Sequence, residues 1–217
     1  MKALKITGIV IGCLILVTIL LTGINILQKG GEYRGQSMGE ILGVSPEKAT
    51  VADIEKLSKA RIFQLFYAAP APEFAEMKGE YRARTINAGI MAAGADYFTH
   101  HFFGPGLWEG KAFYPFEKDK GWGYNLFSVA GKNGDMTTAR TRKMNTYMGI
   151  STIDKKNSFH LDYRPYNGGA VHSMHDEIRK INANLYLGMG HMALGGGAIN
   201  PAPFVLIGPP TAWVGVQ

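Results

Sequence analysis

The longest apolar segment of the chain runs from Ile6 to Leu27 and contains no charged residue. A helix needs about 20 apolar residues to cross the hydrocarbon core of a bilayer, so this segment is long enough to span a membrane. A cleaved signal peptide is the alternative, but its apolar region is shorter and precedes a small-x-small site, which the sequence from Gly23 to Gln28 does not resemble. The pattern therefore predicts a transmembrane anchor over residues 1–28.

Two helices are indicated in the part of the chain that follows. Residues 29–45 are rich in Gly and polar residues and are expected to form a flexible tether. Apolar residues then recur at helical spacing, after Thr50 at a position typical of an N-cap and before Pro70, which ends a helix. This predicts one helix over residues 50–67 and a second, shorter one over residues 90–101.

The rest of the chain changes to short segments with strand-like composition, separated by turn residues. The expected strands are 79–85, 111–116, 123–129, 138–147, 158–164, 171–181, 185–192 and 203–207. Eight short strands in succession suit a small up-and-down antiparallel barrel, whose interior is filled by side chains or holds one small ligand. We therefore expect a mainly β domain over residues 46–217, with one or two flanking helices.

The formal net charge of +6 is concentrated near the N-terminus, where about half of it falls within the first 34 residues. The remaining lysines alternate with acidic residues, Gly and Asn, whereas a nucleic-acid-binding surface needs a basic stripe with interleaved aromatic residues. Nucleic acid is therefore not an expected partner. From the cationic flanks of the anchor, Lys2 and Lys5 before it and Lys29 and Arg34 after it, we expect a cytoplasmic N-terminus and an extracytoplasmic C-terminal domain.

Motifs for cofactor chemistry are absent from the sequence. Cys13 is the only cysteine and lies within the anchor, so the domain has no disulfide and no thiolate. No phosphate-cradling glycine loop, nucleophile elbow, zinc signature or haem-attachment motif is present. The sequence therefore predicts neither a cofactor nor a metal site, and it favours a protein that is not an enzyme.

Several short motifs resemble a known family. These are Leu65-Phe66 at a helix end, Gly79-Glu80-Tyr81-Arg82-Ala83, Trp108-Glu109-Gly110-Lys111-Ala112-Phe113, Asp176 to Ile181, Leu187-Gly188 and Pro203 to Leu206. Together they are similar to the GXWXG-type domain of bacterial proteins and its companion C-terminal module, over most of residues 60–207. Tyr81 stands where the family's name has Trp, and Ala83 stands where it has Gly.

The resemblance implies a lipocalin-like barrel and brings no established reaction with it. Tyr81, Trp108 and Arg179 are then expected to be structural residues. In lipocalin-like barrels a Trp that opens a strand closes one end, and an Arg from a late strand often stacks on it. We therefore expect Arg179, or in its place Arg140 or Arg142, to stack on Trp108, a cation–π contact.

Candidate ligand-binding residues follow from alternation along the expected strands. Lys111 and Phe113 share one strand face, and one of them is expected to face the interior. Arg140 and Arg142 also share a face and could clamp a carboxylate or phosphate, as in a fatty acid. Tyr147, at the end of the same strand, is assigned to the same ligand site.

His160 and Asp162 share a strand face, opposite Phe159, Leu161 and Tyr163. If the apolar face is the core, His160 and Asp162 are solvated; if the apolar face packs outside under a helix, they line the cavity and could act as an acid or base.

His175 and Glu177 are further candidates for the ligand site. Asp176, Glu177 and Arg179 are expected to form cross-strand ion pairs or to be polar groups at the mouth of the barrel. On a strand His172 and His175 point to opposite faces, so they are not expected to share a metal ion.

These observations leave three functions open. The leading hypothesis is a membrane-tethered binding or carrier protein that exchanges a hydrophobic or amphipathic small molecule with the adjacent lipid bilayer. An accessory or structural subunit that contacts other subunits of a membrane complex is the alternative. The third is an isomerase or hydrolase of a hydrophobic substrate, which requires at least two groups in one pocket from the set of His160, Asp162, His172, His175 and the nearby carboxylates.

Overall fold

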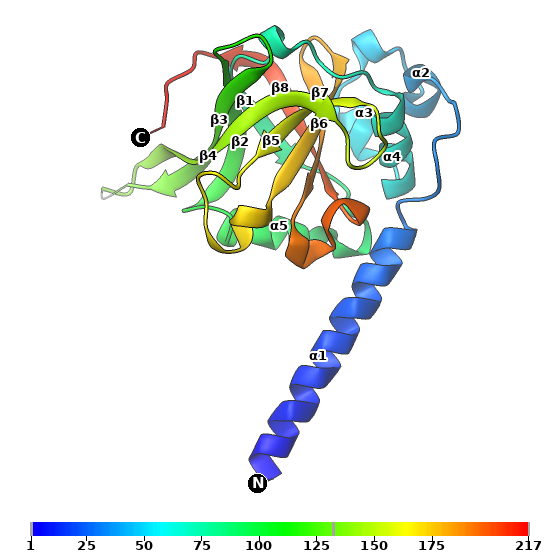
Figure 1. Ribbon diagram of the computed structural model, residues 1–217, viewed down its shortest axis with the longest axis vertical. Coiled ribbons are helices and arrows are strands. Elements are labelled where there is room, and N and C mark those ends of the chain that lie inside the picture. Colours follow the sequence, from blue (N-terminus) through cyan, green and yellow to red (C-terminus); the bar gives the residue numbers. More distant parts are fainter. Residues whose placement is uncertain (1, 132, 217) are drawn as a thin grey trace.

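The computed structural model describes residues 2–131 and 133–216, and most of them form one closed antiparallel barrel (Figure 1). The strands pair in chain order, and the last closes the barrel against the first. They are β1 (Gly79–Thr85), β2 (Leu107–Pro115), β3 (Lys120–Ala130), β4 (Met136–Ile150), β5 (Asn157–Asp162), β6 (His175–Asn182), β7 (Leu185–His191) and β8 (Ala202–Thr211). The predicted up-and-down barrel of eight strands is confirmed.

One long helix, α1 (Lys2–Leu27), projects away from the barrel (Figure 1). Its segment Val10–Leu27 is long and apolar enough to cross a membrane and is almost entirely exposed. The orientation expected from the cationic flanks of this helix stays a prediction, because the fold is compatible with either orientation.

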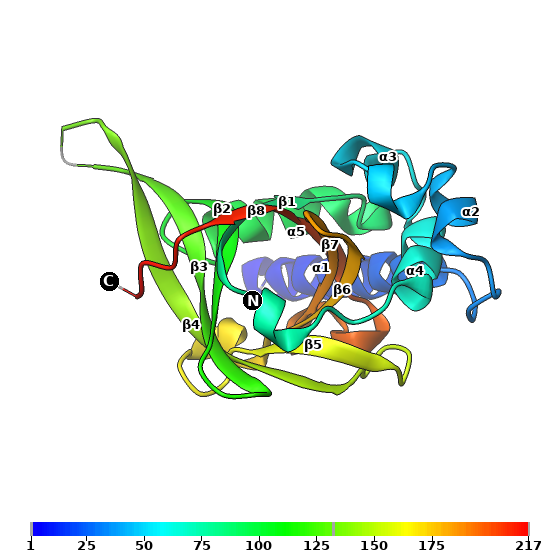
Figure 2. The same cartoon turned by 90° about the horizontal axis from the view of Figure 1, so that it is seen from above.

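Shorter helices cover one side and one end of the barrel. They are α2 (Met38–Leu42), α3 (Val51–Glu55), α4 (Lys59–Ala68) and α5 (Ala92–His101), with 3-10 turns η1 (Pro46–Lys48), η2 (Phe74–Glu76), η3 (Gly89–Met91), η4 (Gly169–Ser173), η5 (Ala193–Gly195) and η6 (Gly197–Ile199). Figure 2 shows α2, α3 and α4 beside β6 and β7, with the turn η2 over the barrel interior. The predicted shorter helix at 90–101 corresponds to η3 and α5.

Two apolar clusters hold these elements together. Outside the barrel, α2–α4 pack against outward side chains of β6–β8, among them Leu187 and Val205. Inside the barrel, Phe74 and Met77 close the end beneath η2 and contact a core of aromatic residues from all parts of the sheet. The opposite end of the barrel is not filled in this way.

The helical part before the barrel differs from the prediction. The expected helix over residues 50–67 is two helices, because Ser58 caps a new start and its side chain accepts a hydrogen bond from the amide of Arg61. Part of the expected tether is folded, since α2 begins with a capping box between Ser37 and Glu40 and buries Ile41 against the outer cluster.

The predicted stacking of Arg179 on Trp108 is wrong. In β6, Ile178 points into the barrel, so Arg179 points outward, as alternation along a strand requires. Its guanidinium lies 4.7 Å from the ring centroid of Phe66 in α4 and donates a 2.7 Å hydrogen bond to Asp154. Arg179 therefore ties the barrel to α4 and to the β4–β5 loop, on the opposite side of the sheet wall from Trp108.

Candidate functional site

A cavity of about 650 Å³ occupies the open end of the barrel. Residues of β1, β2, β6, β7 and β8 form its walls. Residues of η3, α5 and the segment 192–201 lie around its mouth. Most of the lining is apolar, including Ile86, Phe98, Phe103, Trp108, Met174, Met192, Leu194 and Phe204. Small-molecule sites typically have this kind of volume and lining, with few polar groups.

The polar group at the base of the cavity is a buried ion pair. Lys111 Nζ lies 2.9 Å from Asp176 Oδ2, and each side chain is 3% exposed. The ammonium also donates to the hydroxyl of Tyr163 at 2.6 Å and to Asn125 Oδ1 at 2.9 Å. Trp108 Nε1 donates to the same Asn125 oxygen at 3.0 Å, and the Tyr163 hydroxyl donates to Asp176 at 3.0 Å. The network therefore satisfies the three ammonium protons within the protein.

Aromatic rings surround the ammonium group of Lys111. Their centroids lie between 5.1 and 5.6 Å from Nζ and belong to Trp108, Phe204, Tyr163 and Phe103. Burial lowers the pKa of Lys111, and the charge of Asp176 opposes that effect. Burial also raises the pKa of Tyr163 well above its ordinary value, so this phenol stays protonated and donates. Ring faces and the carboxylate together compensate the buried cation.

The mouth of the cavity contacts the last turns of α1. Asn25 lines the cavity, and its side-chain amide donates to Asn200 Oδ1 at 2.8 Å. Lys59 Nζ donates to the backbone carbonyl of Asn25 at 2.8 Å. The last carbonyls of a helix lack partners within the helix, and a cation placed there stabilises them. Gln28 accepts a 2.7 Å hydrogen bond from the amide of Ile90 in η3. Helix α1 is thus fixed directly to the rim.

A pH-dependent gain in stability is expected from Lys59. Burial, together with the charge of Lys29, lowers the pKa of Lys59 to about 8, from an ordinary value of 10.5. Between these values the unfolded chain holds a proton that the folded chain has released, so stability rises with pH. Relative to Lys59→Met, the wild-type chain in detergent should gain unfolding free energy from pH 8 to pH 10. Lys48→Met, at an exposed position, is the control; equal pH trends in wild type and Lys59→Met would contradict the expectation.

A second polar cluster lies on the outer face of β5 and β6, beneath the β4–β5 loop. His160 Nδ1 is 2.8 Å from His175 Nε2, and Glu177 completes a group whose ligating atoms lie within 4.8 Å of one another. Tyr147 stacks on His160 with ring centroids 4.9 Å apart. Burial is the main cause that lowers the pKa values of His160 and His175, the latter to about 4.

The structure separates the candidate residues that the sequence grouped by chemistry. Lys111 lines the cavity, whereas Phe113 lies in the packed core, 5.3 Å from Phe159 between ring centroids. Asp162 accepts a hydrogen bond from the amide of Arg164 and does not line the cavity.

The two arginines lie away from the cavity. Arg140 forms a 2.7 Å ion pair with Glu80, and Arg142 Nε donates to the carbonyl of Phe103 at 2.6 Å. Both arginines instead line a separate hollow beside Gly104 and Pro105, and the expected clamp for an acidic head group stays a prediction.

Neither expectation for His160 describes its position. The apolar face of β5 is the core, yet His160 is only 2% exposed, because Tyr147 and the β4–β5 loop cover it. His172 belongs to η4, is exposed, and contacts the carbonyl of Asn167. The group expected for an isomerase or hydrolase thus does not meet inside the cavity.

Sequence reasoning missed Asp176, Asn125 and Tyr163 as partners of Lys111. One signal was present, because Asp176 shares a strand face with Ile178 and a carboxylate on the apolar face of a barrel strand requires a buried partner. The partner itself comes from β2, and only the barrel's closure identifies it.

Comparisons with known proteins add little to this description. No protein-family model and no curated protein matches the chain. A crystal structure of a protein from Thermomonospora curvata is similar, with 14% sequence identity, a TM-score of 0.43, and coverage of 78% of this chain and 94% of that chain. The barrel is therefore established by the strand pairing of this chain alone.

Proposed function

We propose that this protein is a membrane-tethered binding protein for an uncharged amphipathic, lipid-like molecule, which it exchanges with the adjacent bilayer. The observation that carries the proposal is the cavity of about 650 Å³, mostly apolar, which opens where α1 joins the domain. A ligand of this class could pass between bilayer and barrel without crossing much water.

The chemistry of the cavity base favours an uncharged head group. Lys111 and Asp176 neutralise one another, so a charged head would need a counter-charge that the lining does not offer at that point. Asp176 also borders the cavity beside Gly190, where a Cβ atom would lie 2.8 Å from its Oδ1. The absent side chain leaves room for a hydroxyl or amide that donates to this carboxylate.

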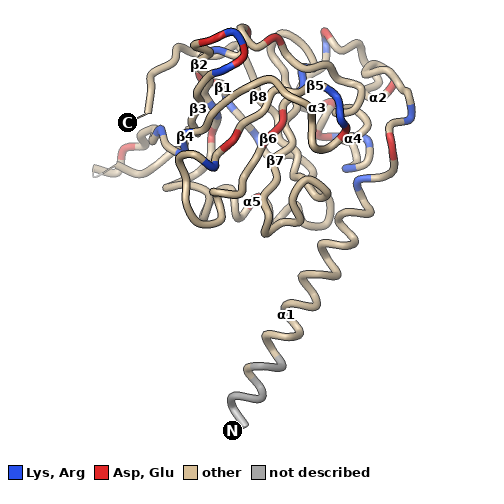
Figure 3. The backbone as a smooth tube through the Cα atoms, viewed as in Figure 1, with Lys and Arg blue, Asp and Glu red and all other residues tan. Residues whose placement is uncertain are grey.

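The rim of the cavity supports exchange with a membrane. It carries exposed apolar side chains in η3, α5 and the segments that follow α5 and β7: Ile90, Tyr97, Phe102, Leu194 and Ile199. Apart from Asp96, residues 89–103 and 192–201 include no Asp, Glu, Lys or Arg. Figure 3 shows little charge at this end of the domain, which is also the end from which α1 extends. Exposed apolar patches of this kind often mark membrane contacts.

A substitution at the mouth tests the proposal. Ala202 lines the cavity opposite Gly190 in the β7–β8 pair, so Ala202→Phe should fill the entrance. Native mass spectrometry of the full chain should find an amphiphile bound to wild type, and about tenfold less of it bound to Ala202→Phe. Ala130→Phe, the same change at an exposed position, should retain the wild-type amount.

Two results would contradict the proposal. One is a wild-type chain that carries no amphiphile and binds neither a long-chain alcohol nor a long-chain amide. The other is equal occupancy in wild type and a folded Ala202→Phe protein.

A further inference from the structure

The polar cluster of His160, His175 and Glu177, on the outer face of β5 and β6, has metal-ligand atoms that the proposed ligand site does not use. His160 comes from β5, and the other two come from alternate positions of β6, where they share a face. In the register of this pair His160 lies directly opposite Glu177. Cross-strand pairing, rather than closeness in the sequence, brings the three side chains together.

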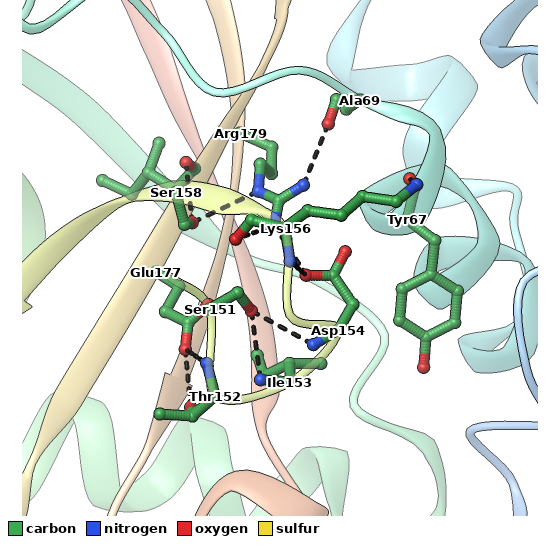
Figure 4. A network of polar contacts seen from close by, with 11 residues as sticks. Tyr67, Ala69, Ser151, Thr152, Ile153, Asp154, Lys156, Ser158, Glu177 and Arg179 are labelled. Atoms are coloured by element: carbon green, nitrogen blue, oxygen red, sulfur yellow. Dashed lines mark hydrogen bonds and ion pairs between the residues drawn. The ribbon is translucent and has the colours of Figure 1, made fainter. Parts of the chain in front are cut away.

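The carboxylate of Glu177 is held in one orientation and keeps one oxygen free. Its Oε1 accepts hydrogen bonds from the amide and the hydroxyl of Thr152, at 2.8 and 2.6 Å (Figure 4). Its Oε2 is buried and has no hydrogen-bond partner among the described residues. Outer partners of this kind orient carboxylates that bind metals.

The charge of this carboxylate is poorly compensated. Glu177 is 0% exposed and forms no ion pair of 4 Å or less within the described part of the chain, since Arg179 pairs with Asp154 instead (Figure 4). A buried carboxylate with a free oxygen and no ion-pair partner is stabilised by a cation bound beside it.

We propose that His160, His175 and Glu177 bind one divalent transition-metal ion, with zinc as the best match. Two imidazole nitrogens and one carboxylate oxygen are a ligand set that zinc accepts, with a further position left open. Two ligands of a tetrahedral zinc ion lie about 3.3 Å apart, given bond lengths of about 2.0–2.1 Å. The observed 2.8 Å between the imidazole nitrogens needs only a small side-chain rotation to reach this separation.

A third imidazole lies next to the proposed site. The ring centroid of His191 in β7 is 5.5 Å from that of His175, and its buried Nε2 has no hydrogen-bond partner among the described residues. His191 also lines the mouth of the cavity. A metal ion here would join β5 to β6 close to the rim of the ligand site, beneath the β4–β5 loop that bonds to Glu177 through Thr152.

Zinc binding to the full chain in detergent tests this inference. After treatment with a chelator and addition of zinc chloride, wild type should retain about one zinc per chain through desalting, measured by mass spectrometry of the metal, and should melt at a higher temperature than without zinc. Glu177→Gln and His175→Gln should each weaken binding by at least about tenfold. His172→Gln, an exposed histidine in the same region, should bind zinc as wild type does.

X-ray absorption at the zinc edge gives a second measurement that depends on no variant. Wild type should show two imidazole nitrogens and oxygen ligands. Sub-stoichiometric zinc in wild type, a spectrum without imidazole, or full binding by Glu177→Gln and His175→Gln would each overturn the inference. Loss of zinc with retention of the amphiphile would separate this site from the proposed function of the cavity.

Discussion

Replacing Asp176 with leucine should lower the free energy of unfolding by about 3–5 kcal/mol, because the change leaves Lys111 without its counter-ion in the barrel interior. Both side chains of the pair are 3% exposed, so water replaces the carboxylate only in part. The aromatic rings around Nζ reduce this cost without removing it, since a cation–π contact contributes about 0.5–2 kcal/mol. Chemical unfolding of the full chain in detergent measures the effect.

A double variant distinguishes this cause from simple loss of packing. Lys111→Met with Asp176→Leu removes both charges and should recover most of the lost stability, because a buried ion pair can be replaced by apolar residues at little cost. Glu117→Gln, in an exposed pair with Lys120, is the control and should change stability very little. A double variant as unstable as Asp176→Leu alone would contradict the assignment.

Truncation of Trp108 to alanine should cost about 3–5 kcal/mol of unfolding free energy, the usual range for a buried Trp. Its indole is 5% exposed, packs edge-on against Phe204 with centroids 5.7 Å apart, and donates to Asn125. The variant also loses one of the two aromatic rings nearest to the ammonium of Lys111, and its cavity is larger.

Trp108→Phe separates these contributions. It retains a ring in the wall and loses the hydrogen bond to Asn125, so a loss of about 1–2 kcal/mol is expected. Thermal and chemical unfolding of the three proteins should rank wild type, Trp108→Phe and Trp108→Ala in that order. Equal stability of Trp108→Ala and wild type would mean that the indole is not part of the packed wall.

The fold could be predicted from the sequence because its strands alternate and its turns are marked by Gly, Asn and Asp. Alternation assigns a face to each residue and leaves open which strands close the barrel, so the partner of Lys111 could not be named. The same limit applies to His160, His175 and Glu177, which meet through the pairing of β5 with β6. The helix α2 could not be predicted at all. It is too short to show a periodic pattern and is stabilised by burial of Ile41 against other elements.

The resemblance to lipocalin-like barrels placed Trp108 at a closed end, stacked with Arg179. In the structure the closed end beneath η2 is filled by Phe74 and Met77, while Trp108 faces the cavity. Sequence motifs identified a buried Trp in a barrel strand, but the end of the barrel that it occupies depends on which loop folds over the interior. That loop, residues 70–78, has no recognisable pattern in the sequence.

Quenching of Trp108 fluorescence by a brominated amphiphile tests the central claim most directly, because bromine quenches only an indole that it approaches closely. The chain has three tryptophans, so Trp122→Phe with Trp213→Phe leaves Trp108 as the reporter. A brominated long-chain alcohol added to this protein should quench its emission in a saturable way, and the unbrominated alcohol should reverse the effect. Ala202→Phe in the same background should prevent quenching. A folded reporter protein whose Trp108 emission stays unchanged at every alcohol concentration would contradict binding of an amphiphile in the barrel.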